Sequence, residues 1–452
     1  MSERDRESAE QAKPAGQPMR VVLTNIGTMG DVHPLIALAL ELRRRGHEPV
    51  LAAPEVFRER VRPLGIDFHA VRPDIDPANT ELAARIYEPK RGTEYGLRRF
   101  LFPVLRQSYD DLMDAVSAPR RADLLVTGEL NYAAPLVADK TGIPWASAVL
   151  APISFFSAYD PPALPMHEWL SAVYGRIPGM GRMVNRLARA ISRSWPEPIL
   201  ALRAELGLPP GANPLFEGKH SPLLVLALFD RLLGERQRDW PTMTVETGFC
   251  YHDADSGMRA LPEGMEQFLA DGAAPVVFTL GSAAVMTAGD FFRVAAEACE
   301  RAGLRGVLLV GPDKRNRAAL QRAGRPLPET LCVAEYAPHS LLFPRAAAVV
   351  HQGGVGTVAQ CLRAGVPMGI VPWSHDQPDN AYRMVRLGVA RSIKRRELTV
   401  ERLAQELAEV LENPGYQVAA RSARQALEGA DGCRAACDAL EKLVLARRVA
   451  AG

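Results

Sequence analysis

A histidine and a glycine-rich turn join an apolar run to a helix-forming run in "HQGGVGTVAQ", residues 351–360. Such a turn brings the backbone close to a ligand and exposes the N–H groups at a helix's positive end, so it favours an anion. His351 ends the apolar run and could donate a hydrogen bond to a phosphate oxygen. The spacing is not G-x-G-x-x-G and no P-loop lysine follows, and the alternative is a tight turn with a core histidine. The residues expected at this turn are His351, Gly353, Gly354, Gly356 and Thr357.

A second polar turn follows the next apolar run, in "PWSHDQPDNA". Asp376 and Gln377 place a carboxylate beside an amide, a pair that can accept from and donate to adjacent sugar hydroxyls. The alternative is that Asp376 or Asp379 caps the following helix. The turn therefore predicts either a site for a polyhydroxylated ligand or a helix start.

The first apolar run of the chain also ends in a turn with ionisable residues, "NIGTMGDVHPLIAL". Gly27 and Gly30 shape the loop, and Asp31 and His33 stand at the start of the following helix. Either side chain could act as a general base toward a hydroxyl placed nearby. The alternatives are an N-cap role for Asp31 and a solvent-facing position for His33.

These turns need a sheet that brings them together, and the chain supplies the pattern for two. Its 452 residues exceed the roughly 250–300 that one core can hold, and strand, helix and strand alternate twice along it. We expect an α/β protein with two doubly wound domains facing across a cleft, with ligands beyond the carboxyl ends of the strands. The expected parts are a disordered tail 1–18, a first domain 19–235, a crossing 236–274, a second domain 275–425 and a C-terminal helix 426–452 that packs back on the first domain.

Composition excludes several classes of protein. The net charge is +2 without a basic stripe, which argues against nucleic-acid binding. The six cysteines are scattered without C-x-x-C, as in a reduced cytoplasmic protein. No apolar run of about 18 residues or more predicts a membrane span, and the polar N-terminal stretch does not look like a signal peptide.

Four stretches together resemble the bacterial family-one, nucleotide-sugar-dependent glycosyltransferases of the GT-B fold. They are "GTMGDVHPLIALALELRRRGHEPVLAAP", "FTLGSA", "YAPHSLLFPRAAAVVHQGGVGT" and "HDQPDN". They lie in the family's order and cover nearly the whole chain after the tail. The similarity is greatest to the branch that holds sterol and glycopeptide-antibiotic glucosyltransferases and the rhamnolipid rhamnosyltransferase.

The resemblance implies a role for each matched residue. It places the donor diphosphate on the turn of His351, with Ser282 after Gly281 as a further contact. It implies that Asp376 and Gln377 bind the donor sugar. The residues that would frame the pyrimidine base are Tyr336, Ala337 and Pro338.

In this branch the general base is the aspartate of the "G-D-V" turn, here Asp31, with His33 as second choice. Other family members pair a histidine base with an aspartate after a later strand. Here Met29 stands near the place of that histidine and Gly128 at the place of that aspartate, with Glu129 next to it as an uncertain helper.

The implied reaction is an inverting transfer of a hexose from a UDP- or dTDP-sugar to a hydroxyl of a mainly apolar small molecule, without a cofactor or metal. Two D-x-D strings, 74–76 and 253–255, are interpreted as surface turns. Aromatic residues of the expected acceptor region are Phe155, Phe156, Tyr159 and Trp169, for which core packing is the alternative. A sugar-nucleotide epimerase and a non-catalytic nucleotide-sugar-binding partner are competing hypotheses. We expect a monomer or weak dimer, with peripheral membrane contact left open.

Overall fold

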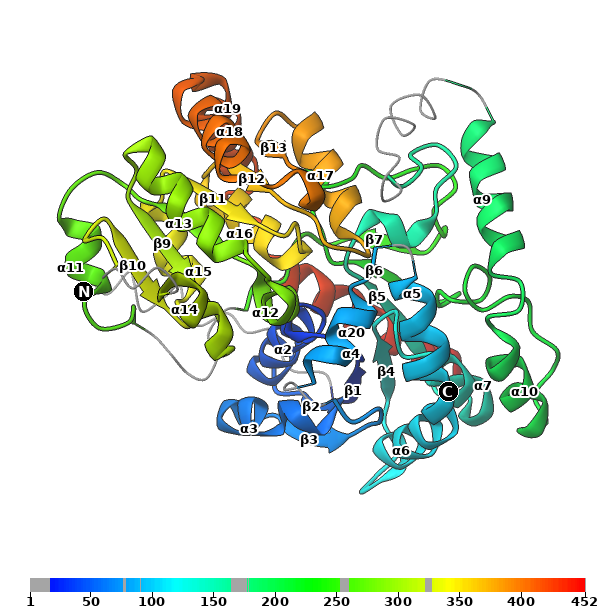
Figure 1. Cartoon of the computed structure of the whole chain (residues 1–452). Helices are drawn as coiled ribbons and strands as arrows, with labels where there is room; N and C mark the ends of the chain where they lie inside the picture. The colour runs from blue at the N-terminus through cyan, green and yellow to red at the C-terminus, as the bar shows by residue number, and fades with distance from the viewer. Residues whose placement is uncertain are drawn as a thin grey trace, which may run out of the picture.

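The computed structural model describes residues 17–75, 79–89, 91–163, 177, 179–252, 260–321 and 327–451. Within these residues two parallel sheets, each covered by helices, form two domains (Figure 1). The first sheet has strand order β3-β2-β1-β4-β5-β6-β7 and the second β10-β9-β8-β11-β12-β13. The expected doubly wound α/β architecture is confirmed.

The strands are short apolar runs, because a parallel strand is buried on both faces. All residues of β1 and β4, for example, are buried. In the first sheet the strands are β1 Arg20–Thr24, β2 Glu48–Ala53, β3 Asp67–Ala70, β4 Leu124–Thr127, β5 Trp145–Val149, β6 Val225–Ala227 and β7 Thr244–Glu246. In the second they are β8 Val276–Thr279, β9 Gly306–Leu309, β10 Leu331–Ala334, β11 Ala348–His351, β12 Met368–Ile370 and β13 Ala390–Ser392.

Helices connect the strands and cover both sheets. Those of the first domain are α2 Met29–Arg44, α3 Arg58–Val61, α4 Thr80–Ile86, α5 Gly92–Tyr95, α6 Leu105–Ser117, α7 Ala133–Thr141, α9 Met180–Ile191 and α10 Glu197–Glu205. The later helices are α11 Met265–Ala270, α12 Gly281–Ala284, α13 Phe291–Ala302, α14 Lys314–Gln321, α15 His339–Leu342, α16 Val355–Ala364, α17 Gln377–Arg386, α18 Val400–Glu412, α19 Pro414–Ala426 and α20 Gly432–Ala451.

The first sheet extends further along the chain than expected. Its edge strand β7 lies inside 236–274, the stretch expected to be the crossing. Strand β7 pairs with β6 in parallel, Val225 opposite Thr244. The first sheet therefore continues past residue 235, the expected end of the first domain.

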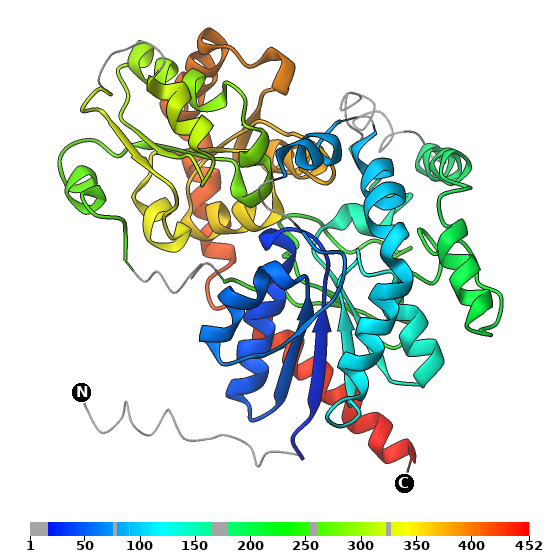
Figure 2. The same ribbon diagram turned by 60° about the horizontal axis from the view of Figure 1, so that its bottom comes forward.

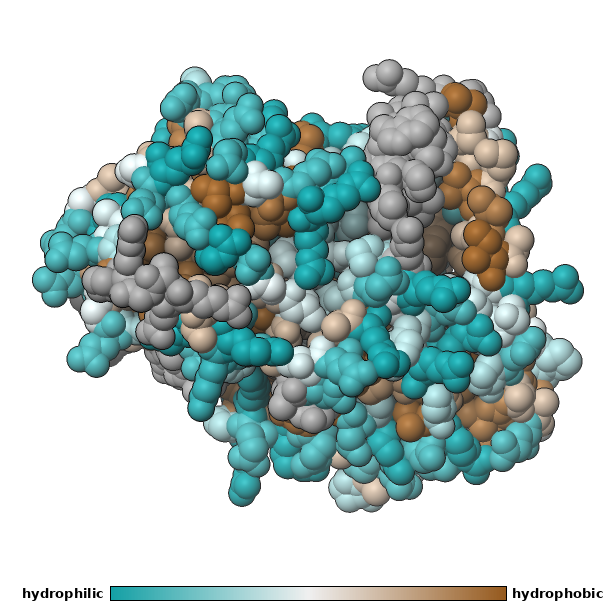
Figure 3. Space-filling view, viewed as in Figure 1, coloured by the Kyte–Doolittle hydropathy of each residue, from teal (hydrophilic) through white to brown (hydrophobic). Residues whose placement is uncertain are grey.

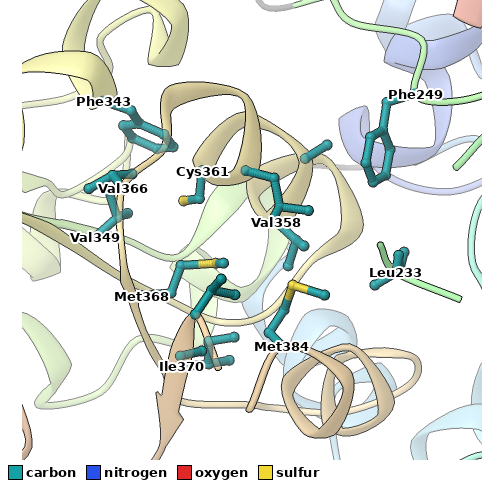
Figure 4. Packing of buried hydrophobic residues seen from close by; sticks show 14 of the residues in the cluster. Leu233, Phe249, Phe343, Val349, Val358, Cys361, Val366, Met368, Ile370 and Met384 are labelled. Atoms are coloured by element: carbon teal, nitrogen blue, oxygen red, sulfur yellow. The ribbon is translucent and has the colours of Figure 1, made fainter. Parts of the chain in front are cut away.

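One apolar core runs from the first domain into the second (Figure 4). Leu233 and Phe249, which follow β6 and β7, belong to the same cluster as Val358 of α16 and Met384 of α17. The two domains therefore share buried surface in addition to their connecting chain.

After α19 the chain returns to the first domain through α20 (Figure 2). Ala436, Cys437 and Leu440 of α20 are fully buried in the core that contains α2. Arg45, at the end of α2, forms an ion pair with Asp438 at 2.7 Å. Helix α20 therefore packs the C-terminal part of the chain against the first domain.

Hydrophilic side chains cover most of the visible surface, and exposed apolar residues gather along α9 (Figure 3). Among the described residues, no helix combines the length and the apolar character that crossing a membrane requires.

Candidate active site

The glycine turn after β11 leads directly into the start of α16. Gly354 is the N-cap of α16, and no side chain caps the helix. His351 is fully buried, and its Nδ1 accepts a hydrogen bond from Gly353 N at 3.0 Å. Burial, followed by the nearby His339, lowers the pKa of His351 to about 3, so the ring is neutral at physiological pH. Because Nδ1 is the acceptor, the proton lies on Nε2, which becomes a hydrogen-bond donor.

Buried polar atoms without a protein partner gather on the turns after β11 and β12. In the described part of the chain they are His351 Nε2, Gln352 Oε1, Ser374 Oγ and Asn380 Oδ1. A buried polar atom that makes no hydrogen bond costs about 1–3 kcal/mol, so such atoms are normally satisfied. Their grouping at the carboxyl ends of two neighbouring strands is where this fold binds polar ligands.

The loop after β8 meets the same region. Gly281 has φ +63°, a left-handed conformation that favours glycine, and a Cβ there would lie 2.4 Å from Gln352 Nε2. Ser282 is exposed at the start of α12, which contacts α2 of the first domain. The expected base-binding residues lie between β10 and α15, Tyr336 partly exposed and both Ala337 and Pro338 buried. In the second domain, the predicted donor residues lie at the carboxyl ends of strands β8, β10, β11 and β12 or in the turns and first helical residues that follow them.

Asp376 and Gln377 begin α17, but they differ in what they can offer a ligand. Gln377 Oε1 accepts from Trp373 N at 2.8 Å and from Ser374 N at 3.3 Å, so the turn itself uses this oxygen. Asp376 occupies the N-cap position without capping the helix, and its Oδ2 accepts from Asn380 Nδ2 at 2.7 Å. Asp376 as a whole residue is partly exposed. The helix-cap alternative is therefore wrong for Asp376.

The cap alternative is also wrong for Asp379. Its carboxylate accepts from Ala163 N at 2.8 Å and from Arg383 Nε at 2.7 Å, and it is fully buried. These partners come from the first domain and from the next turn of α17.

In the first domain, the turn after β1 holds the Asp31 carboxylate in a capping box. Asp31 Oδ2 accepts from Thr28 N at 2.7 Å and from Thr28 Oγ1 at 3.0 Å. A Cβ at Gly27, where φ is +145°, would lie 2.4 Å from Oδ2, so the glycine makes room for the carboxylate. Asp31 is thus a capping-box residue rather than the N-cap, which is Thr28. The two hydrogen bonds from Thr28 to this carboxylate both go to Oδ2.

Asp31 and Asp376 interact across the boundary between the domains. Burial first, and then the charge of Asp31, raise the pKa of Asp376 to about 7. Burial also raises the pKa of Asp31, opposed by its bonds to Thr28 and supported by the charge of Glu129. The first-domain acid and the second-domain acid therefore lie close enough for one to change the protonation of the other.

Tyr87, which follows α4, lies near both acids and was missed by the sequence analysis. Burial, and then the charges of Asp31 and Asp376, raise the pKa of its hydroxyl. Its ring packs edge-on against His375 at 5.2 Å between centroids. His375 has φ +60°, a left-handed conformation that is rare outside glycine, and Thr93 Oγ1 lies 3.3 Å from its Nδ1. First-domain residues thus contact the strained turn that precedes Asp376.

His33 is a partly exposed residue whose Nε2 is buried, so the solvent-facing alternative holds only in part. Its ring packs edge-on against His252 at 5.3 Å. Burial, followed by His252, lowers the pKa of His33 to about 3, which makes it a weak base. Its Nε2 has no partner among the described residues.

The absence of an aspartate after β4 has a steric reason. A Cβ at Gly128 would lie 2.1 Å from Asn25 Cγ, so a carboxylate side chain does not fit there. Glu129, the uncertain helper, is bound by Lys219 Nζ at 3.0 Å and Ser154 Oγ at 2.5 Å. Sequence analysis missed Lys219, because its partner is 90 positions away. Glu129 acts on Asp31 through its charge.

The aromatic residues of the expected acceptor region divide into two groups. Phe155 stacks on Trp240 at 4.2 Å and joins the shared core, as the packing alternative predicted. Phe156 is partly exposed, with Lys219 Nζ 5.3 Å from its ring centroid. Tyr159 is 48% exposed, beneath the guanidinium of Arg238. Phe156 and Tyr159 thus remain partly or largely exposed, whereas Phe155 packs with Trp240.

Some of the predicted residues cannot be placed. Trp169, Asp76 and residues 253–255 lie outside the described residues. Within those that the structure describes, no group of three or more His, Cys, Asp or Glu side chains is arranged to hold a metal ion.

Comparison with known proteins agrees with this geometry. Residues 21–111 match the glycosyltransferase family 28 N-terminal domain, and residues 310–432 match the erythromycin biosynthesis protein CIII-like C-terminal domain. The O-mycaminosyltylonolide 6-deoxyallosyltransferase of Streptomyces fradiae is 32% identical over 447 residues, which is 96% of this chain and 99% of that protein. The chain belongs to the family-one GT-B glycosyltransferases.

Other relatives of this glycosyltransferase support the assignment. Glycosyltransferase GtfE of Amycolatopsis orientalis is 32% identical over 82% of this chain and 85% of its own length. Among solved structures, the glycosyltransferase of kitacinnamycin has a TM-score of 0.69 at 21% identity, covering 95% of this chain and 100% of that one. Glycosyltransferase VinC in complex with dTDP has a TM-score of 0.63 at 20% identity, covering 94% and 99%. At these identities the solved structures establish the fold of the enzyme.

Proposed function

We propose that this glycosyltransferase moves a hexose from a dTDP- or UDP-sugar to a hydroxyl of a mainly apolar natural product, with inversion and without a metal. The observation that carries the proposal is the place of Asp376 beside the His351 turn, where Asn380 Nδ2 donates both to Gly353 O at 2.9 Å and to Asp376 Oδ2 at 2.7 Å. The charge of Asp31 from the first domain also raises the pKa of Asp376. The printed names of the relatives support the substrate classes. One acts on a glycosylated macrolide, several are sterol 3-beta-glucosyltransferases, and VinC was solved with dTDP.

The proposed chemistry is one displacement at the anomeric carbon. The acceptor oxygen forms its bond to that carbon as the bond to the diphosphate oxygen breaks, and Asp31 Oδ1 takes the hydroxyl proton. Attack from the face opposite the leaving group inverts the anomeric configuration. Negative charge grows on the diphosphate, where the first turn of α16 and His351 Nε2–H stabilise it.

Each carboxylate has a separate task in this proposal. The raised pKa of Asp31 strengthens it as a base. Asp376, when ionised, accepts hydrogen bonds from the donor's sugar hydroxyls. The low pKa of His33 supports Asp31 rather than His33 as the base.

The test is the Asp31→Asn variant. Asparagine keeps an oxygen for Thr28 but cannot take the proton, so we expect dTDP to bind within about twofold of wild type while kcat falls roughly 10²–10⁴-fold. Release of nucleoside diphosphate would be measured with dTDP-glucose or UDP-glucose and, as acceptors, 4-methylumbelliferone, a macrolide aglycone and a sterol, with and without EDTA. The exposed Asp114→Asn on α6 is the control. An unchanged kcat would remove Asp31 as the base, and loss of activity in EDTA would contradict metal independence.

A further inference from the structure

A buried ion cluster connects the acceptor side of the first domain to the helix that presents Asp376. Arg383 extends from α17, and its side chain is 5% exposed. Its Nε donates to Asp379 Oδ2 at 2.7 Å, and its Nη1 donates to Asp160 of the first domain. The Asp160 side chain is 19% exposed, so the contact between the domains is largely removed from water.

The backbone of the first domain enters the same cluster. Ala163 N donates to Asp379 Oδ1 at 2.8 Å. At the other end of this segment, Ser157 Oγ and Ala158 N both donate to Asp239 at 2.7 Å. Residues 157–163 directly follow Phe155 and Phe156 in the expected acceptor region. This segment is thus held at one end by its own domain and at the other by α17.

The cluster and the donor-sugar residue share one face of α17. Asp376, Asp379, Asn380 and Arg383 follow a spacing of three, four and seven residues, which places them along one side of a helix. A rigid helix carries a displacement at one end to the other. The position of the acceptor segment is therefore mechanically connected to the position of Asp376.

We propose that Arg383 is a positioning residue for glycosyl transfer. Through Asp160 and Asp379 it fixes segment 157–163 against α17, and so sets the distance between the acceptor hydroxyl and the donor sugar held at Asp376. Correct placement of two reactants is a large part of such catalysis. The inference rests on the proposed function, since it assumes that the two substrates meet beside this helix.

The variants that test it should remove the connection without emptying the core. Asp160→Asn keeps the shape of the side chain and removes its charge from the more exposed member of the cluster. Arg383→Lys keeps the charge but replaces the two-pronged guanidinium by a single ammonium group. Asp114→Asn on α6 is the matched control for the first change.

With dTDP-glucose and 4-methylumbelliferone, we expect Asp160→Asn to raise the acceptor KM about tenfold, a change typical of broken coupling. The share of donor lost to water should rise, since the acceptor is held less well. Binding of dTDP should stay within about twofold of wild type, because the His351 turn is untouched. Arg383→Lys should fall between Asp160→Asn and wild type in acceptor KM.

Two results would overturn the inference alone. One is an unchanged acceptor KM in Asp160→Asn when the wild type is active. The other is a parallel loss of dTDP affinity, acceptor affinity and melting temperature in Asp160→Asn, which marks a merely structural role. A wild type that transfers no sugar to any acceptor would overturn the proposed function, and this inference with it.

Discussion

At the level of single residues, the candidate site depends on which atoms the protein leaves unused. The Gln377 side-chain oxygen already accepts a hydrogen bond from Trp373 N, whereas the buried His351 Nε2 has no partner among the described residues. The distinction is set by local hydrogen bonds, because each residue satisfies its own turn before it can serve a substrate. Polar residues on neighbouring turns can therefore differ in what they offer a substrate.

Replacing His351 by asparagine tests the proposed role of its Nε2 as a hydrogen-bond donor to the diphosphate. Asparagine can still accept from Gly353 N but has no donor at the Nε2 position. Loss of one hydrogen bond to a charged group corresponds to about 1.5–3 kcal/mol, so dTDP should bind roughly 10–100-fold more weakly. Calorimetry with dTDP and with thymidine separates the diphosphate from the base, and thymidine affinity should not change.

His69→Asn on the edge strand β3 is the matched control for that experiment. Equal weakening of thymidine and dTDP would mean that His351 shapes the whole pocket rather than contacting the diphosphate.

The sequence could predict residue types at this scale but not all their partners. The turns of Asp31, His351 and Asp376 follow apolar strands, and this local pattern is visible in the printed sequence. Tyr87 and His375 carry no such pattern. Their role depends on a contact between residues 288 positions apart, which no local spacing encodes.

At the level of secondary structure, the glycines of the α16 turn serve different purposes. Gly353 has φ +88°, and a Cβ there would lie 3.0 Å from Ile370 Cγ2 and 3.1 Å from Gln377 O. Gly356 lies within the first turn of α16 with no heavy atom within 4 Å of its Cβ position. Gly353 is therefore required by the fold, whereas Gly356 leaves space beside helix α16.

Alanine at each position should therefore have opposite effects. Gly353→Ala should lower the free energy of unfolding by about 1–3 kcal/mol, because it forces a side chain into a left-handed conformation. Gly356→Ala should leave stability unchanged or raise it by up to about 1 kcal/mol, yet weaken dTDP binding, since the methyl group enters the donor's space. Thermal unfolding and dTDP calorimetry measure both. Wild-type dTDP affinity in Gly356→Ala would show that the diphosphate lies elsewhere.

The edge strands carry a weaker signal in the sequence than the central ones. The edges of the two sheets are β3, β7, β10 and β13, and most residues of β3, β7 and β13 are exposed or only partly buried. Central strands are continuous apolar runs because both faces are covered, and an edge strand has no such requirement. The missed β7 explains why the first domain extends beyond residue 235.

At the level of the whole molecule, the two domains act on each other through charge. The repeated strand and helix pattern predicted both domains, but not which residues would meet between them. Asp31 and Asp376 are 345 positions apart, and contacts between the domains, among them the packing of Leu233 and Phe249 with residues of α16 and α17, place them in the same part of the molecule. The central claim is that these two acids lie on either side of the donor's sugar.

The pH dependence of dTDP-glucose binding tests this claim most directly. The Asp376 carboxylate must be ionised to accept from sugar hydroxyls, so affinity should rise as pH increases through about 7, the raised pKa of Asp376. Because this pKa is raised, folding also favours the protonated form, and the free energy of unfolding without ligand should fall as pH rises toward 7.

The Asp31→Asn variant lacks the charge that helps to raise the pKa of Asp376. The midpoint of the pH dependence of dTDP-glucose binding should therefore move to lower pH in this variant. Binding of dTDP, which lacks the sugar, should show no such shift. A midpoint unchanged between wild type and Asp31→Asn would contradict the claim, because it would mean that the two carboxylates do not face each other in the working enzyme.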